Sequence, residues 1–320
     1  MKRRVKFHIL LIICLLLLFL FFLKQNINLV ITDKNQQLVD LNNFQYVIKK
    51  DRLCDNSDPL LLLVIISSAA GNVEKRDTIR QTWGQKRDNI RLVFNLGLSD
   101  QNTNAAIKIE DSQHQDIIQG NFMDSYKNMT YKSTLAVKYA AECCPSAKFV
   151  LKCDDDVFVN TPLLLNFLKY DIIPFNVTNS IFCNVNGIMP VIRDAEGRYG
   201  KWYVSYEQYP EQFYPEYCSG MFAIMTSDVA LNLYRNAQKT TFFWIEDVFL
   251  TGIVAKKIWG LRFVNIINFT LVKTDVMSIG TSDLTFLFGG VDMSNWQINF
   301  LWEYVSSRSV KRSVFNILIT

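Results

Sequence analysis

Residues 148–168 constrain the fold most, because an acidic triplet lies there between two apolar segments. The short apolar run at residues 148–151 predicts a buried strand. Asp154-Asp155-Asp156 follows, and an apolar helix then begins with Thr161 as its expected N-cap and Pro162 at its first position. The triplet is therefore predicted at the carboxyl end of a strand, which is where open α/β sheets bind ligands.

The chemistry of the triplet points to a metal. Adjacent carboxylates repel one another, and a divalent cation placed between them removes that penalty. Asp oxygens are hard ligands that suit Mg²⁺ or Mn²⁺, and such a metal typically holds substrate phosphates. The alternative is a solvated acidic turn, but apolar residues flank Asp154–Asp156 on both sides.

The amino-terminal residues predict a membrane anchor. A basic segment, residues 1–6, precedes an apolar run at residues 7–23 that only His8 interrupts. A helix of that length spans about 25 Å, enough for a thin endomembrane bilayer. The basic flank should stay cytoplasmic and place the remainder in the lumen. A cleaved signal peptide is the alternative, but no small-residue cleavage site follows Leu23.

The remainder divides into a polar segment and a globular one. Residues 24–57 are rich in Asn, Gln, Asp and Lys and are interpreted as a stem, with a folded extension around Phe44–Ile48 as the alternative. Residues 58–320 are interpreted as a lumenal catalytic domain, consistent with an apolar content of 49% and a charged content of 20%. A net charge of +4 without a basic stripe argues against nucleic acid as a partner.

A lumenal location makes two further patterns meaningful. Glycosylation acceptor sequences begin at Asn128, Asn176 and Asn268. Six cysteines besides Cys14 could oxidise, and their pairing is open. No CxxC or His-Cys spacing indicates zinc.

Apolar runs alternate with helical periods through the first half of the chain. They predict strands over residues 60–66, 92–97 and 148–151, and helices over residues 72–83, 105–112 and 131–143. This alternation is typical of a parallel sheet with right-handed crossovers. Residues 116–126 are expected to be irregular. In the second half we expect strands over residues 181–185, 201–204 and 221–225, and a helix over residues 228–237.

Two further groups are candidate site residues. Arg76 and Arg80 share a helix face just beyond a strand end, where bidentate contacts would hold a diphosphate; the alternative is a solvated helix. Glu246-Asp247 follows four apolar residues, so one carboxylate is a candidate general base; the alternative is a helix-start pair that the dipole favours. Gly220 would permit close approach of a ligand. His114 is the only histidine of the expected lumenal part, which disfavours His-based catalysis unless His114 is the base.

Six segments, in chain order, resemble the β-1,3-galactosyltransferase group, glycosyltransferase family 31. They are Arg76–Gly84 (RxxIRxTW), Val93–Gly97 (FxLG), Asp124–Lys132 (DxYxNLTxK), Lys152–Phe158 (KxDDDxF), Tyr214–Gly220 (YPxYxxG) and Glu246–Gly252 (EDVxxG).

The resemblance implies an α/β, GT-A-like fold with a Rossmann-like, mostly parallel central sheet behind the transmembrane helix. It also implies a single-pass type II Golgi membrane protein that uses Mn²⁺ and a UDP-sugar donor. Its reaction would be β-1,3 transfer of a hexose or N-acetylhexosamine, with inversion, to an acceptor glycan on protein or lipid. The implied roles are metal binding by Asp154 and Asp156, donor binding by Arg76, Arg80, Lys132, Asp154 and Asp155, and general-base catalysis by Asp247.

This chain departs from the family pattern at one point. Relatives carry a His after the EDV segment, thought to help ligate the metal, whereas nothing from Gly252 to Thr320 is His and Ser278–Thr281 lies where it is expected. The intact Asp154–Asp156 and Asp247 favour the leading hypothesis, an inverting glycosyltransferase. The missing His favours the alternative, a Golgi pseudoenzyme that binds glycans or acts as a chaperone. A metal-dependent hydrolase would fit the carboxylates but not the ordered segments. Donor sugar and acceptor stay open.

Overall fold

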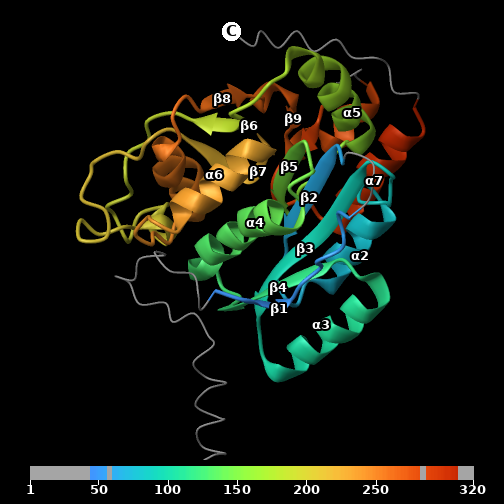
Figure 1. Ribbon diagram of the computed structural model, residues 1–320. Helices are drawn as coiled ribbons and strands as arrows, with labels where there is room; N and C mark the ends of the chain where they lie inside the picture. The colour runs from blue at the N-terminus through green and yellow to red at the C-terminus, as the bar shows by residue number, and fades with distance from the viewer. Residues whose placement is uncertain (1–43, 56–59, 282–285, 309–320) are drawn as a thin grey trace, which may run out of the picture.

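The computed structural model describes residues 44–55, 60–281 and 286–308 (Figure 1). Its centre is an eight-stranded sheet in the order β1-β4-β3-β2-β5-β7-β6-β8. The strands are β1 (Tyr46–Ile48), β2 (Leu62–Ser67), β3 (Ile90–Leu98), β4 (Ile117–Met123), β5 (Phe149–Asp154), β6 (Ser180–Asn186), β7 (Tyr217–Thr226) and β8 (Arg262–Asn265). A small parallel pair, β9 (Thr270–Leu271) and β10 (Phe288–Gly289), lies apart from it.

The predicted mostly parallel sheet is confirmed. Strands β4, β3, β2 and β5 run parallel to one another, and β6 runs parallel to β8. Only the edge strand β1 and the inserted β7 run antiparallel to the strands beside them. In the register of β2 on β5, Ser67 lies opposite Asp154, so both strands end at the same edge of the sheet.

Helices cover both faces of the sheet. The α-helices are α2 (Val73–Gln81), α3 (Gln101–His114), α4 (Met129–Cys143), α5 (Thr161–Asn166), α6 (Ser227–Ala237) and α7 (Asn295–Ser306). Short π-helical or 3₁₀ segments are η2 (Tyr126–Asn128), η3 (Phe167–Ile172), η4 (Ile173–Phe175), η5 (Gly200–Trp202), η6 (Val248–Val254), η7 (Ala255–Lys257), η8 (Ile267–Phe269) and η9 (Lys273–Thr281).

Alternation along β2 shows how the two layers form. Leu63 and Ile65 pack into the core under α4 and α6, whereas Leu62, Val64 and Ile66 pack into the core under α2 and α7. Successive side chains of a strand point to opposite faces, so a strand covered on both sides reads as continuously apolar. In Figure 1, α4 and α6 lie together on one side of the sheet and α2 and α7 on the other.

Residues 44–55 belong to the folded domain, so the predicted stem over residues 24–57 extends too far. Phe44 is 1% exposed, and β1 pairs with β4 through Tyr46 and Gly120. A disulfide joins Cys54 to Cys144 at the end of α4. The alternative of a folded extension is therefore correct from residue 44 onward.

The predicted anchor at residues 7–23 lies outside the described residues. Within the part of the chain that the structure describes, no helix has the length and apolarity needed to cross a membrane.

Residues 116–126, predicted to be irregular, contain strand β4. Polar residues broke the apolar pattern, but they are buried and paired: the Gln119 amide donates to the Gly97 carbonyl, and Asn121 Oδ1 accepts from the Gln45 amide N–H. At Gly120 an added Cβ would lie 2.4 Å from the Phe122 ring, so this strand needs a glycine there.

Two other local predictions are wrong in detail. Residues 201–204 form no strand: Lys201 and Trp202 belong to the turn η5, with i→i+3 bonds from the Trp202 amide to the Tyr199 carbonyl and from the Tyr203 amide to the Gly200 carbonyl. The N-cap of α5 is Asn160, whose side chain accepts from the Leu163 amide, and not Thr161.

The six cysteines of the described residues form two bridges and leave two thiols. Besides Cys54–Cys144, a disulfide joins Cys183 in β6 to Cys218 in β7. Cys143 and Cys153 are buried free thiols. The second bridge fastens β7 at the end that carries Gly220.

Candidate active site

Asp154 ends β5, and one oxygen of its carboxylate has no partner among the described residues. Its Oδ1 is buried and accepts no hydrogen bond from the described residues. Burial raises the pKa of Asp154 to about 7, and the charges of Glu246, Asp156 and Asp155 add to this against the opposing Lys152. An unpartnered buried acceptor is costly unless something binds it, so this oxygen indicates a cation or a donor group.

Asp155 is held by protein. Its Oδ2 accepts from Ser68 Oγ and Asn72 Nδ2, both at 2.8 Å, and its Oδ1 accepts from Lys75 Nζ at 3.0 Å. These bonds attach the loop after β2 to the triplet. Asp155 therefore positions the loop, and both of its oxygens already accept hydrogen bonds within the protein.

Asp156 is the last residue of the triplet. Burial raises its pKa, with Lys75 acting in the opposite direction. Its backbone carbonyl accepts from the Met293 amide at 3.0 Å, which fixes the turn against the segment before α7. Asp156 therefore has a fixed backbone and a carboxylate that a counter-charge would stabilise.

The second acidic pair lies at the start of η6. Glu246 Oε1 pairs with Lys152 Nζ at 2.7 Å and accepts from Ser133 Oγ. Lys152 comes from β5, two residues before Asp154, and is only 4% exposed. This buried ion pair fastens the second acidic pair to the strand that ends in the first.

Asp247 caps η6 and retains a free oxygen. Its Oδ1 accepts from the Val248 amide at 2.8 Å, while Oδ2 accepts no hydrogen bond from the described residues. Burial raises the pKa of Asp247 to about 6, and the charge of Glu246 adds to the shift. Asp247 therefore does lie at a helix start, as the alternative interpretation had it, with Oδ1 as the capping oxygen. Its Oδ2 remains available for proton transfer.

Gly220 lets the two acidic groups converge. Strand β7 passes the end of β5 with Phe222 opposite Cys153. A Cβ on Gly220 would lie 3.3 Å from Glu246 Oε2 and 3.8 Å from Asp247 Oδ2. The predicted close approach at Gly220 is thus to the protein's own carboxylates, which meet Asp154 at the carboxyl edge of the sheet.

This donor set fits a divalent cation that shares its coordination with a substrate. Among residues 44–55, 60–281 and 286–308, no three His, Cys, Asp or Glu side chains form a metal cluster by themselves. Mg²⁺-type sites are commonly built from one or two carboxylates and substrate phosphates. The unpartnered Oδ1 of Asp154 and the carboxylate of Asp156 match that pattern, whereas Asp155 does not.

Arg76 is unsuited to the predicted diphosphate role. It is 1% exposed, and its guanidinium donates to both oxygens of Glu110, to Ser68 Oγ and to the carbonyls of Ala69 and Ala70. An arginine has five N–H donors, and all are used. The structure contradicts diphosphate binding here because no donor remains.

Arg80 belongs to the same structural network. Its Nη2 donates to Glu110 and Asp116, Nε donates to Asp116, and Nη1 donates to Asp77. The shared helix face predicted for Arg76 and Arg80 is correct, but it faces carboxylates from α3 and the start of β4. Four of the five N–H donors of Arg80 are thus used by carboxylates of the protein itself.

Lys132 supports the loop instead of a nucleotide in this structure. Its Nζ donates to the Ser68 carbonyl at 2.8 Å and to Asp124 at 2.6 Å, and it is 2% exposed. The cation best placed for a phosphate is Lys75, whose side chain is 33% exposed beside Asp155. The sequence signal for Lys75 was its place in the first turn of the helix after β2.

The glycosylation acceptors differ in access. Asn128 is 8% exposed and its Nδ2 donates to the Met123 carbonyl, which argues against a glycan on this residue in the folded domain. Asn176 and Asn268 are exposed.

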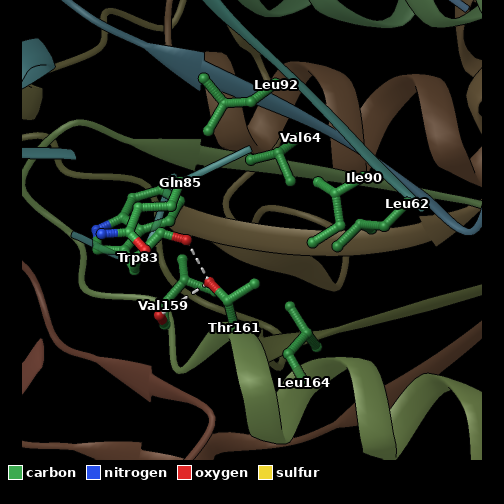
Figure 2. A pocket seen from close by; sticks show the side chains of 10 residues that line it. Leu62, Val64, Trp83, Gln85, Ile90, Leu92, Val159, Thr161 and Leu164 are labelled. Atoms are coloured by element: carbon green, nitrogen blue, oxygen red, sulfur yellow. Dashed lines mark hydrogen bonds between the residues drawn. The ribbon is translucent and has the colours of Figure 1, made fainter. Parts of the chain in front are cut away.

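Two hollows lie away from these carboxylates. Figure 2 shows a narrow one between Leu62, Val64 and Ile90 on one side and Leu164 on the other, with Thr161 Oγ1 bonded to the Trp83 carbonyl at 2.6 Å. A wider one of about 560 Å³ lies between the segment after α2 and the end of α3. The narrow hollow is lined from the amino-terminal halves of β2 and β3 and the wider one from that of β3, so neither is the candidate active site.

Comparisons with known proteins show the same family across much of the domain. The sequence profile of the family described as galactosyltransferase matches residues 74–262. A lactosylceramide 1,3-N-acetyl-beta-D-glucosaminyltransferase from Xenopus tropicalis is 36% identical over 228 residues, covering 67% of this chain and 59% of that protein. Beta-1,3-galactosyltransferase 5 from Mus musculus is 34% identical over 208 residues, covering 63% of this chain and 65% of that protein. The chain thus spans less than two thirds of the length of these relatives.

Solved structures resemble the chain more remotely. The bifunctional glycosyltransferase WbbM matches with a TM-score of 0.41 and 11% identity, covering 82% of this chain and 54% of that one. The galactosyltransferase LgtC matches with a TM-score of 0.37 and 10% identity, covering 78% and 97%. The family assignment therefore depends on the sequence matches.

Proposed function

Because this chain belongs to the galactosyltransferase family, glycosyltransferase family 31, we propose that it transfers a hexosyl group from a UDP-sugar to a hydroxyl of an acceptor glycan. The transferred sugar is galactose or an N-acetylhexosamine, and the new linkage is β-1,3 with inversion at the anomeric carbon. The observation that carries the proposal is that Glu246 and Asp247 converge at Gly220 while the charge of Glu246 also acts on Asp154 at the end of β5.

Asp247 is the general base of this proposal. Glu246 is paired with Lys152 and Ser133, whereas Asp247 Oδ2 has no partner in the described structure. A base must accept a proton from the attacking hydroxyl, and its efficiency is greatest when its pKa lies near the working pH. The pKa of Asp247, raised to about 6, meets that requirement while leaving the carboxylate mostly ionised at pH 7.

The reaction is a single displacement. The acceptor oxygen forms a bond to the anomeric carbon, its proton passes to Asp247 Oδ2, and the bond from the anomeric carbon to the diphosphate breaks on the opposite side. Asp154 and Asp156 would hold Mn²⁺ or a related cation, which supplies charge neutralisation for the departing UDP. Lys75 adds positive charge at the same edge and takes the diphosphate-binding role predicted for the two arginines.

We place the domain in a GT-A-like fold, bound to the Golgi membrane as a single-pass type II protein. The family membership and the mostly parallel sheet support the fold. The basic flank and the apolar run at residues 7–23 support the location. The acceptor is a glycan on protein or lipid.

A donor screen tests the proposal. The full chain, purified in detergent with Mn²⁺, is offered UDP-galactose, UDP-N-acetylgalactosamine and UDP-N-acetylglucosamine with a panel of free saccharides as acceptors. Transfer from one donor that Asp247→Asn removes would support the assignment. If no donor is used, while the protein still binds glycans, the pseudoenzyme alternative replaces it.

A further inference from the structure

An exposed tyrosine stands beside the catalytic carboxylates. Tyr126 is 54% exposed, and its ring meets the Trp244 ring edge-on with centroids 6.3 Å apart. Trp244 directly precedes Ile245 and the Glu246-Asp247 pair, so Tyr126 packs on the segment that leads into the candidate site. Burial raises the pKa of the Tyr126 phenol, and the charges of Asp247 and Glu246 contribute to the rise, as their proximity requires.

A second aromatic ring reaches the same place from a different part of the chain. Trp202 lies in η5, within the long segment that joins β6 to β7, and its Nε1 donates to Tyr126 Oη at 2.7 Å. Lys201 Nζ lies 4.4 Å from the Trp202 ring centroid and 5.4 Å from that of Tyr126. The hydrogen bond therefore holds two rings and one ammonium group together next to Trp244, three residues before Asp247.

Stability alone gives little reason for this arrangement. Trp202 is half-buried, and a partly exposed hydrogen bond adds little net stability because water competes for both groups. Exposed large apolar side chains also gather along the same β6–β7 segment; they are Ile188, Met189, Tyr199, Tyr203, Tyr206 and Phe213. Aromatic rings held in place at a catalytic mouth are typical of ligand recognition.

We propose that Tyr126 and Trp202 form the platform on which the acceptor sugar stacks, and that this sugar is a neutral hexopyranoside. This inference rests on the proposed glycosyl transfer. The negative faces of aromatic rings attract the polarised C–H groups on the apolar face of a pyranose, as they attract the positive edges of other rings. A sugar stacked there presents its hydroxyl edge toward Asp247, and Lys201 donates to its outer hydroxyls.

The test distinguishes the contribution of the Trp202 ring to acceptor binding from that of its hydrogen bond to Tyr126. It uses the full chain, with lactose as the acceptor probe. Trp202→Ala removes the ring and should raise the lactose KM about two- to tenfold, the range for one aromatic contact, with the UDP-sugar KM unchanged. Trp202→Phe and Tyr126→Phe each remove the same hydrogen bond and keep a ring. Each should give a smaller rise, and the double variant should add little, because coupled residues are not additive.

Tyr206→Ala is the matched control. Tyr206 is 63% exposed on the same segment and packs under Arg193, and its loss should leave the lactose KM unchanged. If Trp202→Ala transfers sugar with an unchanged lactose KM, the platform is wrong while the transfer activity stands.

A binding measurement keeps the inference testable without turnover. Saturation-transfer NMR on the unmutated protein should show lactose protons on the apolar pyranose face in contact with aromatic protons. Loss of that signal in Trp202→Ala, with UDP binding retained, would support the platform even if no donor is turned over. Absence of lactose binding to the unmutated protein, or binding that Trp202→Ala leaves intact, would overturn it.

Discussion

Asp247→Asn is expected to remove transfer and at the same time make the protein more stable. The amide keeps the hydrogen bond that Oδ1 accepts from the Val248 amide, so the start of η6 stays in place. It cannot accept a proton from the attacking hydroxyl, and loss of a general base typically lowers the rate by about 10²–10⁴. Donor binding should be retained because Asp154 and Asp156 are untouched.

The stability gain follows from the pKa of Asp247, which burial and the charge of Glu246 raise from 3.8 to about 6. The folded state therefore favours the neutral acid and pays for ionisation once the pH exceeds the unfolded value. About two pKa units correspond to about 3 kcal/mol as an upper limit. The gain of the amide variant should be full above about pH 6, fall between about pH 6 and pH 4, and vanish below that range.

The assay combines three measurements on one pair of proteins. Turnover, the UDP dissociation constant, and urea unfolding at several pH values are compared for Asp247→Asn and the unmutated chain. Glu303→Gln, which changes an exposed carboxylate on α7, is the control and should alter none of them. Turnover within a few-fold of the unmutated value would show that Asp247 is not the base. Equal stability at pH 7.5 would show that its carboxylate is not held in a dry position.

Three further predictions concern the metal, the ion network and the glycans. Asp156→Ala should abolish Mn²⁺-dependent UDP binding by calorimetry; equal UDP affinity of the unmutated protein with and without Mn²⁺ would remove the metal from the scheme. Glu110→Ala leaves Arg76 buried without its carboxylate and should cost about 3–5 kcal/mol in urea unfolding, whereas a loss below about 1 kcal/mol would mean that the network contributes little. Endoglycosidase should increase gel mobility, Asn176→Gln and Asn268→Gln should each remove part of that shift, and Asn128→Gln should remove none; a shift lost with Asn128 would contradict its burial.

Local patterns in the sequence predicted much of the sheet and where its acidic residues would lie. The apolar runs at β2, β3 and β5 and the helical period of α4 were readable because burial on both faces, or on one helical face, leaves a direct record in composition. The six family segments predicted the functional class that the comparisons support. The position of Asp154 at a strand end followed from β5 and the helix start after it.

Pairing between distant residues was decided only by the tertiary structure. Periodicity says which face of α2 is covered, but the partner that covers it comes from α3, so Arg76 appeared free for a phosphate although Glu110 neutralises it. Strand β4 was missed because its buried amides are satisfied by groups far along the chain, such as the backbone of Gln45. The approach of Gly220 to Glu246 and Asp247, beside the strand that ends in Asp154, depends on β7 running antiparallel to β5, a pairing that no local pattern specifies. The strand order of the sheet determines which distant segments of the chain become neighbours, and so which hydrogen bonds and ion pairs can form between them.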